Sequence, residues 1–129
     1  MTSNPVGWFE IYVQDMPRAK AFYEGVFQLS LSPLPTDPAL EMWSFPGPSP
    51  ENYRSTPGAT GALVRMPGCP SGGGGTLVYF SCADCGIEAA RAAALGGQIA
   101  RPKFAIGEYG HIALVVDTEG NMIGLHSWQ

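Results

Sequence analysis

The stretch that decides the fold runs from Trp8 to Tyr23 and reads WFEIYVQDMPRAKAFY. Its first part is aromatic and β-branched around a single acid, which favours a β-strand over 8–13. Asp15 then offers a helix N-cap before Met16-Pro17, and proline is accepted in a first helical turn. The spacing of the apolar residues that follow predicts an amphipathic helix. Its expected buried stripe is Ala19, Phe22, Tyr23, Val26 and Phe27.

A second copy of this order begins near residue 76. Residues 76–82 predict a strand and Asp84 a second N-cap, and glycines at 96–97 suit the left-handed backbone that follows a helix end. The expected buried stripe of this second helix is Ile87, Ala90, Ala94 and Leu95. Aligning Asp15 with Asp84 gives an offset of 84 − 15 = 69 residues, so the chain is predicted to be a twofold repeat. The offset pairs Trp8 with Leu77, Glu10 with Tyr79 and Ile11 with Phe80.

Short apolar runs after each helix predict further strands. They lie at 29–31, 41–45 and 62–66 in the first half and at 98–101, 111–116 and 122–127 in the second. Prolines crowd 46–57 and glycines 67–75, which is typical of loops. Strand, helix and about three strands, repeated twice, predict an α+β fold. We expect a single domain over 5–128, with a first module at about 5–67, a linker over 68–75 and a second module at about 76–128.

The composition narrows the class of protein further. A length of 129 residues suits one domain. The net charge is −4 and the seven lysines and arginines are scattered, so we expect no nucleic-acid partner. The sequence shows no secretory signal and no apolar run long enough for a membrane helix. Three cysteines do not make a disulfide framework, and a cytoplasmic protein is expected.

The repeat, the opening 8–23 and the closing 117–126 (DTEGNMIGLH) together resemble the vicinal oxygen chelate superfamily. This superfamily includes glyoxalase I, bleomycin-resistance proteins and extradiol dioxygenases. The resemblance implies a glyoxalase-like fold, in which two βαβββ modules form a curved mixed sheet around a cavity. It also implies a homodimer, and a divalent metal held by His and Glu on the sheet.

The metal-ligand positions that the resemblance implies hold other residues here. The first ligand, a His seven residues before the Asp at the strand end, corresponds to Trp8, and its repeat mate is Leu77. The position of the last-strand Glu corresponds to Gly124. A catalytic metal normally takes three nitrogen or oxygen ligands from the protein. We therefore expect the usual metal site to be missing, with no cofactor and no assigned catalytic residue.

One alternative set of ligands remains open. Glu10 shares a strand face with Trp8, and His126 shares one with Gly124. With His111 they would form a two-His-one-carboxylate site for zinc, nickel, manganese or iron. The protein would then be a glyoxalase-like lyase or a dioxygenase.

The leading interpretation is a binding protein for a small, partly apolar molecule. Aromatic residues supply stacking surface, and Glu10 with His126 supplies polar orientation. A carboxylate between Trp8 and Tyr12 is costly to bury alone, so it is expected to meet water, a cation or a ligand donor. The expected pocket residues are Trp8, Glu10, Tyr12, Trp43, Tyr79, Tyr109 and His126.

Cys82 and Cys85 form a C-x-x-C pattern where the second strand meets its helix. A helix N-terminus lowers the pKa of a thiol, so Cys85 is the candidate reactive cysteine if it is exposed. Cys82 falls on the face of Val78 and Phe80 and is expected to fill the core. Redox activity of the pair stays open.

Overall fold

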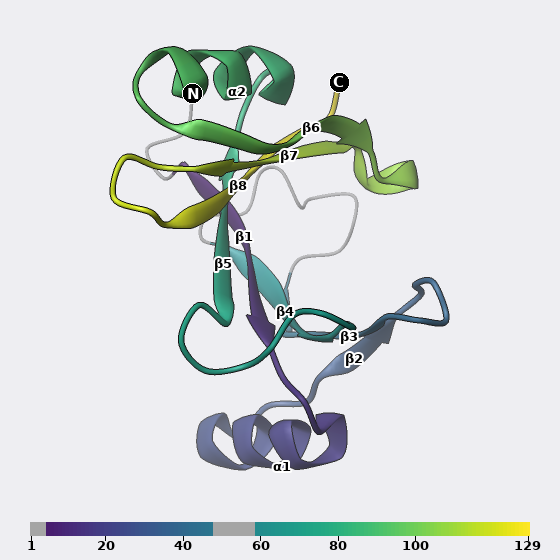
Figure 1. The fold of residues 1–129 in the computed structure, drawn as a ribbon. Helices are drawn as coiled ribbons and strands as arrows, with labels where there is room; N and C mark the ends of the chain where they lie inside the picture. The colour runs from purple at the N-terminus through teal and green to yellow at the C-terminus, as the bar shows by residue number, and fades with distance from the viewer. Residues whose placement is uncertain (1–4, 48–58) are drawn as a thin grey trace. The chain divides into compact units, whose positions relative to one another are not determined.

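The computed structural model describes residues 5–47 and 59–129 (Figure 1). The proline-rich loop predicted at 46–57 lies almost entirely outside these residues. The described chain forms an α+β fold of eight strands, two helices and a short 3-10 helix, η1. The strands are β1 (Val6–Tyr12), β2 (Ser32–Leu34), β3 (Glu41–Ser44), β4 (Thr60–Arg65), β5 (Thr76–Ser81), β6 (Gln98–Ala105), β7 (His111–Val116) and β8 (Met122–Ser127). The helices are α1 (Met16–Phe27), α2 (Cys85–Ala94) and η1 (Gly107–Tyr109).

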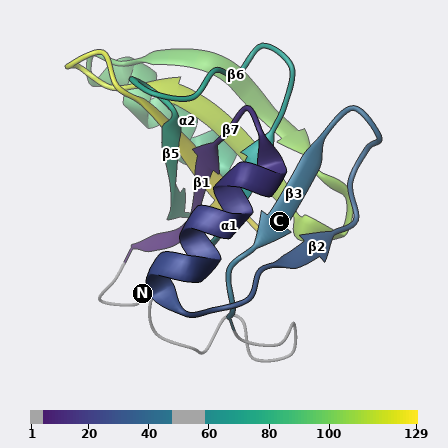
Figure 2. The same ribbon diagram turned by 90° about the horizontal axis from the view of Figure 1, so that it is seen from below.

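The chain separates into two compact units. One contains residues 8–76, and the other contains residues 77–129 together with the start of β1 up to Gly7. In the first unit β1 pairs in parallel with β4, β4 in antiparallel with β3, and β3 in antiparallel with β2. The strand order is therefore β2-β3-β4-β1. Helix α1 covers one face of these strands and lies in front of them in Figure 2.

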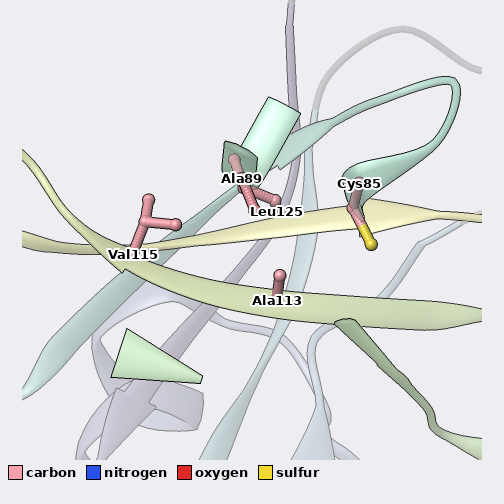
Figure 3. Close-up of a cluster of buried hydrophobic side chains, with 5 residues drawn as sticks. All are labelled: Cys85, Ala89, Ala113, Val115 and Leu125. Carbon is pink, nitrogen blue, oxygen red and sulfur yellow. The ribbon is translucent and has the colours of Figure 1, made fainter. Parts of the chain in front are cut away.

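The second unit has the same topology. β5 pairs in parallel with β8, and β8-β7-β6 continue in antiparallel. Its core holds Cys85 and Ala89 from α2, Ala113 and Val115 from β7, and Leu125 from β8 (Figure 3). The predicted twofold repeat of strand, helix and three strands is confirmed.

Both predicted helix caps are present. The Asp15 side chain accepts a hydrogen bond from the Arg18 amide at 3.0 Å, and the Asp84 side chain accepts one from the Gly86 amide at 3.1 Å. Gly96 follows α2 with a φ of 103°, in the region that favours glycine. These local signals fix where the helices begin and end.

The predicted buried stripes are only partly correct. On α1, Ala19 and Tyr23 pack against the core, and Met16 is buried. The remaining stripe residues, Phe22, Val26 and Phe27, are 60%, 55% and 58% exposed. Lys20 and Glu24 are half-buried, so the inner face of α1 is turned toward them and away from Phe22 and Val26.

The stripe predicted for α2 is wrong. All four of its residues, Ile87, Ala90, Ala94 and Leu95, are exposed, and α2 instead buries Cys85 and Ala89 with Ala92 beside them. Alanines occur on every side of this helix, so apolar spacing does not identify the inner face. Small side chains on that face allow α2 to approach Ala113, which is fully buried.

The strands at 111–116 and 122–127 have the predicted bounds, and the others are shifted. Strand β6 runs on through Pro102 to Ala105, because two register shifts around Arg101 and Phe104 take the proline out of the ladder. The predicted 29–31 strand forms instead as β2, at Ser32–Leu34.

The closing motif forms the turn between β7 and β8. Asp117 accepts hydrogen bonds from the amides of Glu119 and Asn121, each at 2.8 Å, and Gly120 takes a φ of 84°. These hydrogen bonds hold the pKa of Asp117 below its usual value, and the one from the Asn121 backbone amide has the largest effect. The Asp-x-x-Gly-Asn pattern therefore sets the register of β8.

Candidate functional site

The face of β1 that points away from α1 carries the best-defined group of predicted site residues. Trp8, Glu10 and Tyr12 share this face, as period-two alternation predicts. Trp8 Nε1 donates a hydrogen bond to Glu10 Oε2 at 3.1 Å, and the Tyr12 hydroxyl donates one to Glu10 Oε1 at 2.5 Å. Each carboxylate oxygen thus has one aromatic donor. All three side chains are partly exposed, so a ligand can reach them.

The floor beside this group is apolar. In the parallel register Ala62 lies opposite Glu10 and Val64 opposite Tyr12, and both are buried. Apolar floor and a few convergent polar groups are the usual make-up of a small-molecule site. We name Trp8, Glu10 and Tyr12 the β1 triad.

Trp43 is not brought to the face of Glu10. It pairs with Leu63 in β4 and packs on the α1 side of the sheet, against the core that contains Val13 and Met16. Its Nε1 donates to Glu41 Oε2 at 3.0 Å. The face of a four-residue strand depends on its register with β4, which the β3 sequence alone does not contain.

Tyr79 fills the space above Gly124. The two residues are in register between β5 and β8, and a Cβ added to Gly124 would overlap the Tyr79 ring. Tyr79 is 6% exposed. The position where the family resemblance implies a Glu ligand is therefore occupied by an aromatic ring, and no side chain fits there beside it.

His126 lies on the same face of β8 as Gly124 and binds the η1 turn. Its Nε2 is 2.6 Å from the Tyr109 carbonyl oxygen, so this nitrogen carries the proton and donates. The Trp128 ring meets the imidazole edge to face, with centroids 4.8 Å apart. The Tyr109 side chain itself is 44% exposed. The backbone carbonyl of Tyr109 thus orients His126.

His111 lies on the opposite face from His126. It is in register with Ser127, whose hydroxyl accepts a hydrogen bond from the Cys85 amide at the start of α2. His126 is instead in register with Ile112. The two imidazoles therefore lie on opposite faces of these strands and do not converge on one ion.

The donors needed for a resident metal do not fit at the implied positions. Over residues 5–47 and 59–129, no group of three or more His, Cys, Asp or Glu side chains is placed to hold an ion. With the ring of Tyr79 above Gly124, the residues present fit an aromatic wall better than a chelate.

The cysteines are all free thiols. Cys85 is fully buried, so the exposure on which its reactivity depended is absent. Cys82 packs against the same core, as predicted, and burial raises its pKa to about 11. Capping by Asp84 turns the Cys85 side chain inward under α2.

Two features of the first unit were not predicted. A pocket of about 310 Å³ follows β4, lined by Gln14, Arg65, Met66, Pro67, Gly68, Cys69 and Pro70. On the α1 side, Lys20 Nζ lies 3.3 Å from the centre of the Trp43 ring, and Arg65 Nε lies 3.2 Å from Glu41 Oε1. The Glu41-Met42-Trp43 alternation was a usable signal for this second cluster, because it mirrors Trp8-Phe9-Glu10.

Within the described residues, no helix is long and apolar enough to cross a membrane. No curated protein sequence is similar enough to the chain to count as a match. Among solved structures, the hypothetical protein BH1468 from Bacillus halodurans C-125 superposes with a TM-score of 0.70 at 13% identity, covering 99% of this chain and 96% of that one. The methylmalonyl-CoA epimerase from Mycobacterium tuberculosis superposes with a TM-score of 0.65 at 13% identity, covering 98% and 91%.

A variant of the methylmalonyl-CoA epimerase from Streptomyces coelicolor, in complex with 2-nitronate-propionyl-CoA, gives a TM-score of 0.68 at 12% identity and covers 98% of each chain. At these identities the likeness shows a shared fold. Residues 6–125 match the family described as the Glyoxalase/Bleomycin resistance protein/Dioxygenase superfamily. Because that match spans nearly the whole chain and the fold agrees with it, the protein belongs to this superfamily.

Proposed function

We propose that the protein binds a small, partly apolar molecule and does so without a resident metal. The observation that carries this proposal is the β1 triad, in which one carboxylate stands between two aromatic donors above a buried apolar floor. Such a group stacks on the apolar part of a ligand and orients its polar part. Tyr79, His126 and Tyr109 of the second unit are further proposed pocket residues.

Metal independence is supported by the residues at the implied ligand positions. Trp8, Leu77 and Gly124 offer no imidazole or carboxylate, and the Tyr79 ring covers Gly124. The test is elemental analysis of the native protein, before and after incubation with zinc, nickel, manganese or iron followed by desalting. We expect far less than one metal per chain in each sample. One tightly held ion per chain would contradict metal-independent binding.

Ligand binding is tested with a fragment library of aromatic and aliphatic compounds, observed by NMR through the ligand signals. We expect hits whose binding weakens by about tenfold in Trp8→Ala, as loss of a stacking surface predicts. Trp43→Phe is the matched control, because Trp43 lies on the α1 side of the sheet. A library with no hits, or hits that Trp8→Ala leaves unchanged, would contradict binding at the β1 triad.

We also propose that the protein is a cytoplasmic homodimer. The family resemblance supports the dimer, and the three free thiols support a reducing compartment. Large apolar side chains exposed on both helices, such as Phe22 and Ile87, offer surface for subunit contacts.

A further inference from the structure

The first unit contains two tryptophan–glutamate pairs of the same construction. In each, the two residues stand two apart on one strand, and the indole Nε1 donates to the carboxylate. The Trp43–Glu41 distance is 3.0 Å and the Trp8–Glu10 distance is 3.1 Å. The pairs lie on opposite faces of the sheet formed by β1, β4 and β3, because Trp43 packs toward α1 and Glu10 faces away from it.

The Trp43–Glu41 pair is occupied by cations of the chain itself. The Lys20 ammonium sits over the Trp43 ring, 3.3 Å from its centre, and the Arg65 guanidinium contacts Glu41 at 3.2 Å. An aromatic face attracts a cation through its quadrupole, and a neighbouring carboxylate adds a full charge. This cluster shows which chemistry such a pair accepts in this fold.

The Trp8–Glu10 pair has the same attractive elements and a second aromatic residue, Tyr12. Among residues 5–47 and 59–129, no lysine, arginine or histidine forms an ion pair with Glu10. The two hydrogen bonds it accepts come from neutral donors and leave its negative charge uncompensated. A partly buried carboxylate in that situation favours a positively charged partner.

We propose that the β1 triad selects an organic cation, binding its ammonium or guanidinium end against Glu10 and the rings of Trp8 and Tyr12. This inference rests on the proposed function and names the ligand class of the same site. The chain has eleven acidic and seven basic residues, so its net charge of −4 also draws cations toward it. The partly exposed rings of Trp8 and Tyr12 also offer apolar surface to the uncharged part of the same ligand.

The test compares choline with 3,3-dimethyl-1-butanol, which has the same shape but no charge. Both are titrated into the native protein, and the indole N–H signal of Trp8 is followed by NMR after assignment with Trp8→Phe. This N–H donates to Glu10, so it reports binding at the triad directly. We expect choline to bind at least about tenfold more tightly than the neutral alcohol.

Replacing Glu10 removes the charge and keeps an acceptor oxygen. Glu10→Gln is expected to reduce choline binding at least about tenfold and to leave the alcohol within about twofold. Glu41→Gln is the matched control, since Glu41 belongs to the equivalent pair on the α1 side, and choline binding should not change. The comparison of the two probes on the native protein stands even if Glu10→Gln does not fold.

The outcomes separate the two proposals. Equal binding of choline and the alcohol would overturn cation selection and leave a small-molecule site at the triad. Binding of neither probe would also overturn cation selection, and the fragment screen with Trp8→Ala would then decide the proposed function by itself. If Glu41→Gln abolished choline binding and Glu10→Gln did not, choline would bind on the α1 side of the sheet. That result would overturn the inference.

Discussion

Gly124 shows how a residue without a side chain determines the packing of its neighbour. Gly124 leaves room for the Tyr79 ring, which lies where a Cβ at 124 would otherwise stand. Glycine is required here by close approach of a neighbouring side chain, because its φ is not positive. The aromatic wall of this strand pair therefore depends on two residues together.

Gly124→Ala is predicted to destabilise the protein by about 1–3 kcal/mol, because the added methyl group overlaps the Tyr79 ring and forces repacking. Urea unfolding of the two proteins measures the difference in free energy. The control is the same substitution in a Tyr79→Leu background, where the ring is gone and the added cost should largely disappear. A full and equal cost in both backgrounds would show that Tyr79 does not set the requirement for glycine.

The thiols are predicted to differ sharply in reactivity. Cys85 is fully buried and Cys82 has a pKa of about 11, so neither supplies an accessible thiolate near neutral pH. Cys69, in the loop after β4, is partly exposed. Mass spectrometry after brief iodoacetamide treatment should therefore show one alkylation, at Cys69, in the native protein and three in urea. Rapid native labelling of Cys85 would contradict its burial.

Asp84 is predicted to make stability depend on acid pH. Its pKa lies below the usual 3.8, chiefly because Lys103 Nζ donates a hydrogen bond to it at 2.7 Å. A carboxyl group with a lowered folded pKa adds stability above its unfolded pKa and loses it as the pH falls through the folded value. Asp84→Asn keeps the helix cap and removes the charge.

Denaturant unfolding at a series of pH values should therefore show Asp84→Asn less stable than the native chain at neutral pH. The difference should shrink as the pH falls below 3.8. Lys103→Met removes the partner and should follow the same pH profile. A difference that is constant with pH would instead assign the effect to local packing.

At the scale of single elements, the structure identifies which sequence signals carry enough information. Short apolar runs predicted the bounds of β7 and β8, and the two Asp caps predicted the starts of both helices. The inner face of α2 was mispredicted, because alanine occurs on both its faces. Apolar spacing reports a helix face only where large side chains are confined to one side.

A pair of substitutions on α2 tests this assignment. Ala89 is 2% exposed, so Ala89→Leu should overpack the core and cost about 1–3 kcal/mol of unfolding free energy. Ile87 is 56% exposed, and Ile87→Gln should change the stability of the folded subunit by less than about 0.5 kcal/mol. Thermal or urea unfolding distinguishes the two. The reverse ranking would restore the stripe predicted from the sequence.

The sequence predicts the candidate site only where the residues concerned lie on a single strand. The triad shares a face because alternation along β1 requires it. The position of Trp43 depends on pairing with Leu63, and the contact between Tyr79 and Gly124 depends on the parallel register of β5 and β8. These are relations between segments distant in sequence, and no local pattern encodes them.

At the scale of the whole molecule, the proposed homodimer rests on the family resemblance. Sedimentation equilibrium at micromolar concentration should give twice the mass of one chain. Apolar side chains as exposed as Leu95, at 73%, are the surfaces we expect a partner subunit to cover. A single-chain mass across the concentration series would contradict the dimer.

The division of β1 between the two units has a consequence for folding during synthesis. Residues 8–76 are contiguous and can complete their unit while the rest of the chain is still being made. The other unit needs both ends of the sequence, since the Ser81 amide donates to the Pro5 carbonyl and β8 lies near the C-terminus. Contacts that close such long loops form slowly. We therefore expect the unit that holds α2 to complete its core only after β8 has been synthesised, because Leu125 of β8 packs with Cys85, Ala89 and Val115.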